Sequence, residues 1–269
     1  RARSDSGKNR SVLMQDAVST AIGRAVDALA KDATKLTNPD VARALLLAGG
    51  KGHDRTAALQ GMLAQLVDPA QWPKEAHVPM AAALAAAERY GKAKPTDLEA
   101  AQKLLVVDQH PDGSYGSAID TWLARTALIA SGMQPDNFTI VQIDKWSRGM
   151  TVENLTDATA ATLLIELSSD VMAENLRRSS LGLIRPAQRP DGGFASTEGA
   201  PGVYDTALVV VALAMLDAEP RLARSTYRPE ELKEAIAKGK AFLVAQQRPD
   251  GTWPEGLAAN AWALTALLS

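Results

Sequence analysis

The sequence predicts an all-α protein, a closed (α/α)6 toroid in which six helical hairpins form an inner and an outer ring of helices. Three observations lead to this fold class. Alanine and leucine dominate a 269-residue chain that is 46% hydrophobic but only 4% aromatic, a composition typical of closely packed helices. One short turn pattern recurs three times with constant spacing. The helix that follows each turn is apolar on nearly every side, which predicts that it is buried.

The recurring pattern places a glutamine, an Asp-Gly pair and an aromatic residue at fixed intervals. Its copies are Gln109-x-x-Asp112-Gly113-x-Tyr115, Gln188-x-x-Asp191-Gly192-x-Phe194 and Gln247-x-x-Asp250-Gly251-x-Trp253. Proline precedes each Asp-Gly pair, and Pro-Asp-Gly favours a tight turn because proline presets φ, aspartate binds nearby amides and glycine accepts positive φ. Each copy therefore ends one helix sharply, and we expect the glutamine amide to bond to the end of a helix beneath the aromatic ring.

The hairpins follow one another at about 40 residues, the usual length of a two-helix repeat. Asp112 and Asp191 are 79 residues apart, so a degenerate hairpin is expected between them. The expected first helices cover residues 11–30, 54–67, 98–107, 137–149, 174–184 and 234–245, and the expected second helices cover 39–49, 77–91, 117–130, 153–168, 202–216 and 256–268. Residues 1–10 are predicted to form a disordered basic tail, which leaves 11–269 as a single toroid domain.

The two helices of each hairpin differ in polarity, which assigns them to different rings. The later second helices are apolar all round, whereas the first helices are striped, as shown by Leu232, Ile236 and Leu243 against Lys233 and Lys240. An open solenoid would expose a face of the apolar helices to water, so the closed arrangement is the better prediction.

Composition excludes several function classes. A formal net charge of −2 without a basic stripe argues against a nucleic-acid partner. The absence of cysteine excludes disulfides, thiolate metal sites and a cysteine nucleophile. The longest apolar run, 207–216, is about half of the roughly 20 residues that a transmembrane helix needs. The polar start at Arg1 fits a mature or trimmed N-terminus, and the compartment stays open between periplasmic or secreted and cytoplasmic.

The segment KAFLVAQQRPDGTW, residues 240–253, resembles the QW repeat of squalene-hopene and oxidosqualene cyclases. YDTALVVVALAML, residues 204–216, resembles the inner helix that follows such a repeat. The resemblance extends over about residues 98–269. It implies the (α/α)6 barrel shared by these cyclases, protein prenyltransferase β subunits and complement-like thioester domains, in which ligands enter the central cavity where the inner helices begin.

The sequence lacks the catalytic signatures of these relatives. No aspartate-rich DxDD or DCTA-type string occurs, and aromatic side chains that would stabilise carbocations are few. A prenyltransferase-type zinc site needs cysteine, whereas this chain offers only His53, His77 and His110 as soft ligands. We therefore predict neither a metal nor a cofactor.

Candidate site residues lie near the starts of the expected inner helices. Asp120, Asp157 and Asp205 each occupy the first turn of such a helix, and Asn260 lies at a comparable place in the last one. In a closed ring these side chains would converge on one mouth, where carboxylates raise each other's pKa and act as acids, bases or ligands. The simpler interpretation is helix capping, because Asp and Asn are common near helix N-termini.

Three further residues complete the candidate set. His77 begins an inner helix at about the place of the aspartates, where it would be a base, a ligand or a half-buried, hydrogen-bonded side chain. Tyr204 precedes Asp205, and Glu198 lies in the long loop 193–204, which is expected to overhang the cavity as a ligand-binding element.

Two functions follow from these observations. The missing signatures favour a binding or interaction module for a hydrophobic small molecule, a glycan or a protein partner. The alternative is an enzyme, either a divergent cyclase-like isomerase or a polysaccharide-active barrel, whose catalytic residues would be Asp120, Asp157, Asp205 and His77. A subunit or fragment of a larger assembly is a third possibility.

Overall fold

The computed structural model describes residues 2–32, 34–165, 171–196, 199–218 and 227–269, and every regular element in these ranges is a helix. An isolated bridge between Gln188 and Phe194 is the extended pairing found there. The predicted all-α class is confirmed. None of the helices in the described ranges is both long enough and apolar enough to cross a membrane.

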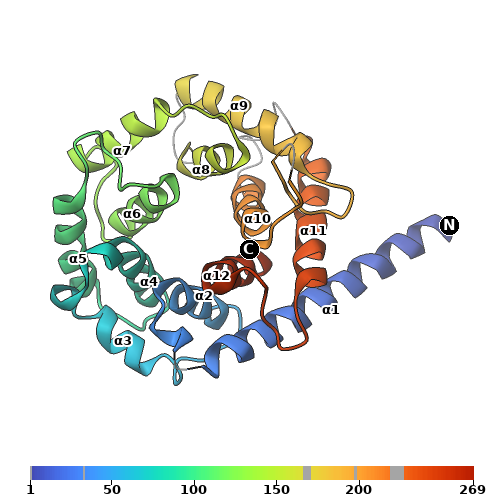
Figure 1. Cartoon of the computed structure of the whole chain (residues 1–269), viewed down its shortest axis with the longest axis horizontal. Coiled ribbons are helices and arrows are strands. Elements are labelled where there is room, and N and C mark those ends of the chain that lie inside the picture. Colours follow the sequence, from blue (N-terminus) through green and yellow to red (C-terminus); the bar gives the residue numbers. More distant parts are fainter. Residues whose placement is uncertain (1, 33, 166–170, 197–198, 219–226) are drawn as a thin grey trace.

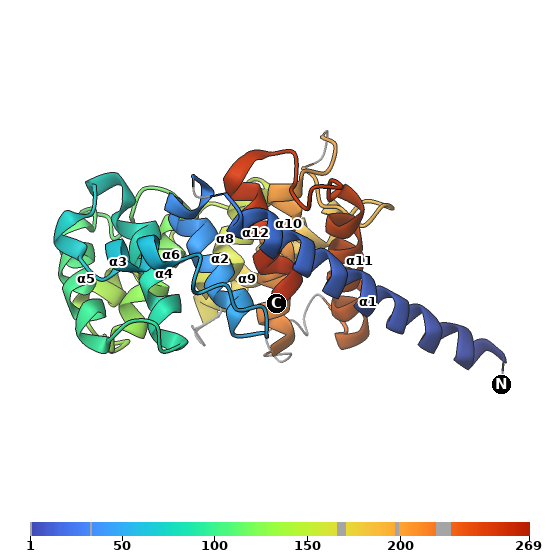
Figure 2. The same cartoon turned by 90° about the horizontal axis from the view of Figure 1, so that it is seen from below.

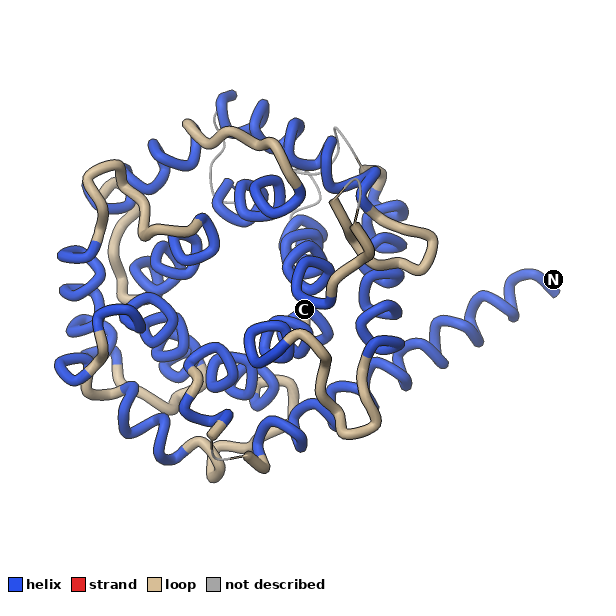
Figure 3. Tube along the Cα trace, in the orientation of Figure 1, coloured by secondary structure: helices blue, strands red, loops and turns tan. Residues whose placement is uncertain are grey.

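The helices form two concentric layers around a common centre (Figures 1 and 3). The outer helices are α1 (Ala2–Ala30), α3 (Gln60–Leu66), α5 (Pro95–Asp108), α7 (Phe138–Arg148), α9 (Val171–Ala187) and α11 (Pro229–Gln246). The inner helices are α2 (Pro39–Gly49), α4 (His77–Arg89), α6 (Ala118–Ala130), α8 (Leu155–Ile165), α10 (Val203–Ala218) and α12 (Gly256–Leu268). Short 3-10 turns at Lys35–Thr37, Pro69–Gln71 and Lys74–Ala76 join some of them.

Capping residues fix where several of these helices begin. The Asn38 side chain accepts the amides of Asp40 and Val41 at the start of α2. Ser117 and Asn137 cap α6 and α7 in the same way. These side chains satisfy amides that have no partner within the first turn of a helix.

The inner helices make up most of the core. In α12 every residue from Ala259 to Leu268 is buried, and α10 is buried almost as completely from Thr206 to Leu213. Each inner helix packs against the next one along the chain, and α12 packs against α2. The last inner helix thus returns to the first, as Figure 1 shows.

The repeated glutamines connect each turn to the following outer helix. Gln109 Nε2 donates to the Gly113 carbonyl (3.1 Å) and, across the gap, to the Thr139 carbonyl in α7 (2.9 Å). Gln188 makes the same two bonds to Gly192 and to Ala235 in α11. The Gln109 acceptor lies in the first turn of α7, at a helix end as expected, whereas the Gln188 acceptor lies farther along α11.

The third glutamine joins the two ends of the array. Gln247 Nε2 donates to the Gly251 carbonyl (3.0 Å) and to the Ala21 carbonyl of α1 (2.9 Å). The contact between the last turn and the first helix is the same as the contact between neighbouring hairpins. We call the region where α1 meets α11 and α12 the seam.

Helix α1 begins at Ala2, so residues 2–10, for which the sequence predicted a tail, belong to its first turns. Figures 1 and 2 show this part of α1 projecting beyond the outer layer, while the remainder lies along α11 and α12.

Candidate functional site

Charged side chains in the first turns of α2, α6 and α10 lie close enough to influence one another's ionisation. Burial raises the pKa of Tyr204, and the negative charges of Asp40, Asp120 and Asp205 raise it further. Burial also raises the pKa of Asp40, with an additional contribution from Asp120. We refer to Asp40, Arg43, Asp120, Tyr204 and Asp205 as the mouth cluster.

Arg43 is the most deeply placed member of the mouth cluster. Its side chain is buried, and its Nε and Nη2 atoms have no hydrogen-bond partner among the described residues. The guanidinium lies 4.4 Å from the ring centroid of Trp262, and burial lowers its pKa. Buried polar groups in native proteins nearly always have partners, so an orphaned arginine requires an explanation.

Asp40 has an unsatisfied atom beside this arginine. Its Oδ1 is buried without a hydrogen-bond partner in the described part of the chain. Arg43 lowers the pKa of Asp40, but the effect of burial is larger and the net shift is upward. The mouth cluster therefore presents an unpaired donor and an unpaired oxygen side by side.

Two indoles fill the interior below the mouth cluster. The ring centroids of Trp122 in α6 and Trp262 in α12 are 5.9 Å apart, with an interplanar angle of 41°. These helices are not neighbours in the inner ring, so the pair crosses the interior. The wide central cavity that the cyclase resemblance implies is thus occupied by side chains at this level.

Asp120 and Asp157 take part in helix caps. Ser117 Oγ accepts the Asp120 amide (3.0 Å) and donates to the Asp120 carboxylate (2.6 Å). Asn154 accepts the Asp157 amide (3.0 Å) and donates to the Asp157 carboxylate (2.7 Å). The capping interpretation accounts for the local bonds of both aspartates.

Asp205 differs from them because another residue caps its helix. The Glu255 carboxylate, in the turn before α12, accepts the amides of Val203 (2.7 Å) and Tyr204 (2.9 Å). Burial raises the pKa of Asp205, and the nearby Glu255 charge raises it further. Asp205 is therefore not needed as the cap of α10.

Asn260 has a structural role in the last turn. Its amide oxygen accepts the Trp253 amide (2.8 Å), and its nitrogen donates to the Trp253 carbonyl (3.0 Å). Thr121 and Thr206 accept the amides of Tyr115 and Phe194 in the same manner. Asn260 thus corresponds to these threonines, one position after the aspartates.

His77 lines a pocket of about 460 Å³ together with Asp108, Tyr115 and Asp120, which is also a member of the mouth cluster. His77 Nδ1 lies 2.5 Å from Asp108 Oδ2, and Nε2 lies 3.3 Å from the Trp72 carbonyl. Both ring nitrogens therefore have protein partners, as expected of a half-buried, hydrogen-bonded histidine.

Asp157 is not part of the mouth cluster. Asp157 lines another pocket of about 500 Å³ with Lys145 and Trp146. Glu198 lies outside the described residues. Within the described ranges, no three or more His, Asp or Glu side chains are grouped as a metal site would require.

Sequence analysis missed Asp40 and Arg43. The available signal was a charged residue at the centre of 39–49, an otherwise apolar helix that the fold places in the inner ring. Long charged side chains are almost never fully buried unless they are paired.

Comparison with known proteins leaves the family open. No model of a known protein family matches the sequence, and no curated protein matches it. Among solved structures, a type II terpene cyclase from Scytonema in complex with its substrate geranylgeranyl dihydroxybenzoate is similar over 96% of this chain and 98% of that chain, with 13% identity and a TM-score of 0.36. A likeness this loose transfers neither a fold nor an activity.

Proposed function

We propose that this chain is an (α/α)6 toroid that acts as a binding module and holds a small ligand at the mouth cluster. The observation that carries the proposal is the buried guanidinium of Arg43, whose Nε and Nη2 have no hydrogen-bond partner in the part of the chain that the structure describes. An unpaired buried polar group costs about 1–3 kcal/mol, and more when it is charged. A ligand that accepts hydrogen bonds from Arg43 would recover this cost.

The surrounding charges restrict the polar group of the ligand. Asp40, Asp120 and Asp205 all act on the same small region, which disfavours a fully anionic head group. A hydroxyl or carbonyl can accept from Arg43 without adding a charge, and a hydroxyl can also donate to Asp40 Oδ1. The indoles of Trp122 and Trp262 offer apolar surface to the hydrocarbon part of the ligand. The proposed ligand is a hydrophobic molecule with a neutral polar head group.

Titration with farnesol, a neutral apolar alcohol, tests the proposal through tryptophan fluorescence. We expect saturable quenching with the wild type and at least about tenfold weaker binding for Arg43→Met, since one charge-assisted hydrogen bond contributes about 1.5–3 kcal/mol. Farnesyl diphosphate, which adds an anion to the same chain, should bind more weakly than farnesol.

Arg125→Met is the matched control for this titration. Arg125 is also a buried arginine of an inner helix, but its Nε donates to Asp144 at 2.9 Å. If Arg125→Met weakens farnesol binding as much as Arg43→Met does, or if neither protein binds farnesol, the mouth cluster is not the binding site.

One observation favours an enzyme as the second candidate. Asp40 combines an unpaired oxygen with a raised pKa, the properties of a carboxylic acid that can donate a proton in a site shielded from water. Incubation with squalene in D₂O would reveal an isomerised, deuterium-labelled product, and Asp40→Asn should abolish its formation. Unlabelled squalene recovered intact from the wild type would exclude this activity.

A further inference from the structure

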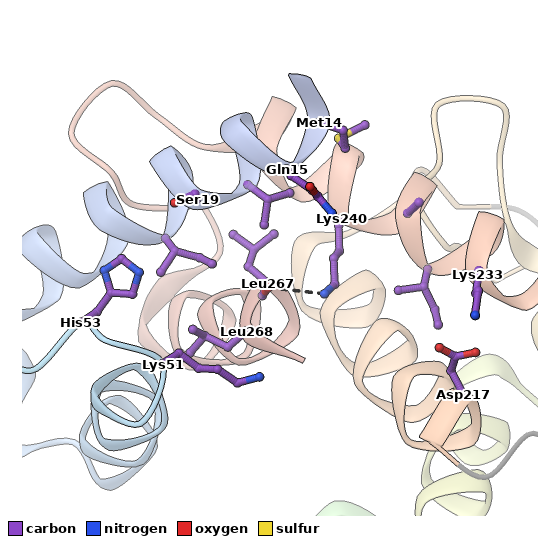
Figure 4. A pocket seen from close by; sticks show the side chains of 14 residues that line it. Met14, Gln15, Ser19, Lys51, His53, Asp217, Lys233, Lys240, Leu267 and Leu268 are labelled. Atoms are coloured by element: carbon purple, nitrogen blue, oxygen red, sulfur yellow. Dashed lines mark hydrogen bonds between the residues drawn. The ribbon is translucent and has the colours of Figure 1, made fainter. Parts of the chain in front are cut away.

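A pocket separate from the mouth cluster lies in the seam, where the first and last helices of the chain meet (Figure 4). Its volume is about 390 Å³, within the range of small-molecule pockets. It is lined by Met14, Gln15, Val18, Ser19 and Ile22 of α1, Lys51 and His53 of the α2–α3 connection, Asp217 of α10, Lys233, Ile236, Ala237 and Lys240 of α11, and Leu267 and Leu268 of α12.

The walls of the seam pocket are apolar. Val18 and Ile22 of α1, Ile236 of α11, and Leu267 and Leu268 of α12 all contribute to its lining. These residues belong to the main hydrophobic core or pack directly against it. The pocket is therefore an apolar opening between α1, α11 and α12 at the edge of the main core.

The charged groups of the seam pocket are mostly cationic. Lys51, Lys233 and Lys240 line it together with one carboxylate, that of Asp217. Lys51 and Lys233 have no ion-pair partner within 4 Å among the described residues. Asp217 Oδ1 likewise lacks a hydrogen-bond partner there, so this acid neutralises none of them directly.

Lys240 is positioned to hold an anionic group at the inner end of the pocket. Its ammonium donates to a backbone oxygen of Ser269 (2.6 Å) and more weakly to the Leu267 carbonyl (3.4 Å). An ammonium has three donors, so one remains for a ligand. Burial and the nearby Lys51 lower the pKa of Lys240, an effect that a bound anion would reverse.

We infer that the seam pocket binds a single-chain amphiphile with an anionic head group, such as a medium-chain carboxylate. The apolar walls take the chain, and the carboxylate lies near Lys240, with Lys51 and Lys233 adding positive potential. A neutral apolar ligand would leave these cations uncompensated, and a cationic amphiphile would be repelled. This site is independent of the mouth cluster and of its proposed ligand.

Calorimetric titration with dodecanoate, below the concentration at which it forms micelles, tests the inference. We expect one molecule to bind per chain, and dodecyltrimethylammonium, with the same chain and the opposite charge, not to bind. Lys240→Met should weaken dodecanoate binding at least tenfold, whereas Lys240→Arg should retain most of it.

Lys238→Met is the matched control on the same helix. Lys238 is exposed and pairs with Glu234 at 2.8 Å, and it does not line the pocket. Val18→Glu, which places a negative charge on the α1 wall, should abolish binding independently of Lys240. Thermal unfolding of each variant shows whether a loss of binding comes from a loss of folding.

Three outcomes would overturn the inference. Equal binding of dodecanoate and dodecyltrimethylammonium would indicate nonspecific partitioning. An equal loss of dodecanoate affinity in Lys238→Met and Lys240→Met would show that the seam pocket is not the binding site. If the protein cosediments with phosphatidylglycerol vesicles but does not bind monomeric dodecanoate, the ligand is a membrane surface and not a free amphiphile. Because Arg43→Met leaves the seam pocket intact, it should bind dodecanoate normally even if it no longer binds farnesol.

Discussion

Two buried arginines of the inner helices differ in whether their guanidinium has a carboxylate partner among the described residues. Arg125 donates to Asp144, whereas Arg43 Nε and Nη2 have no partner among the described residues. Arg125→Met should lower the free energy of unfolding by about 2 kcal/mol, because it leaves a partly buried carboxylate unpaired. Arg43→Met should change it by less than about 1 kcal/mol, since the lost contact with Trp262 is offset by removal of an unpaired buried charge.

Urea unfolding of both variants gives these free energies directly. If Arg43→Met lowers the free energy of unfolding by about 2 kcal/mol or more, this arginine stabilises the fold. We would then no longer infer that it is available to bind a ligand.

The raised pKa of Asp40 predicts how the stability of the protein depends on pH. Burial raises its pKa in the folded protein above the ordinary value of 3.8, so between the two values the folded state binds more protons than the unfolded state. The contribution of Asp40 to stability therefore falls as pH rises from about 4 through the raised pKa. Asp40→Asn removes this dependence and should be more stable relative to the wild type at pH 7 than at pH 4. Thermal midpoints of both proteins across this range test it, and a constant difference would contradict the raised pKa.

At the residue scale, the sequence identified the acids but could not distinguish their roles. Asp120, Asp157 and Asp205 occupy equivalent first turns, yet only the fold shows that Ser117 and Asn154 engage the first two and that Glu255 takes the capping role at the third. A residue 50 positions away in sequence determines that difference, and no local pattern reports it.

Turn geometry dominates at the scale of the element. Gly251 has φ +87°, and a Cβ placed there would lie 2.4 Å from the Arg24 carbonyl oxygen of α1. Gly132 has φ +89°, but a Cβ there would meet no atom within 4 Å. Gly132→Ala should therefore cost about 1 kcal/mol from backbone strain alone, and Gly251→Ala about 3 kcal/mol because the clash with backbone adds to it.

Chemical denaturation of the two alanine variants measures this difference. Similar losses of unfolding free energy in both variants would show that the Gly251 turn is not packed tightly against the backbone of the following outer helix. Gly113 and Gly192 make equivalent contacts with Gln142 and Lys238, so their alanine variants should resemble Gly251→Ala.

The sequence predicted these elements well because their signals are local. Pro-Asp-Gly ends a helix through its own backbone preferences, and apolar periodicity depends only on the helix that carries it. The partners of the glutamines were not predictable in this way. Gln109 binds Thr139 and Gln247 binds Ala21, and both acceptors are backbone carbonyls, which every residue type provides.

For the whole molecule, the bond between Gln247 and Ala21 makes the seam equivalent to the internal contacts between hairpins. A linear repeat array unfolds from its ends, because each terminal repeat packs against only one neighbour. In this chain every inner helix packs against two other inner helices, so we expect one cooperative thermal transition. Gln247→Ala should lower the midpoint of that transition. Hydrogen exchange should show reduced protection in α6, across the ring, as well as in α1. Loss confined to α1 would indicate that the seam is a peripheral contact.

The seam also bears on how such a chain can change in length. An open array gains or loses a hairpin with little effect on the others, because each unit rests on its neighbours alone. In this chain the turn before α12 already fits against α1, with Gly251 in van der Waals contact with the α1 backbone and Gln247 bonded to it. Adding or removing a hairpin would change the angle between every pair of neighbouring hairpins. Duplications and deletions of whole repeats should accordingly be rare in its evolution, and variation should collect in the loops and in the projecting end of α1.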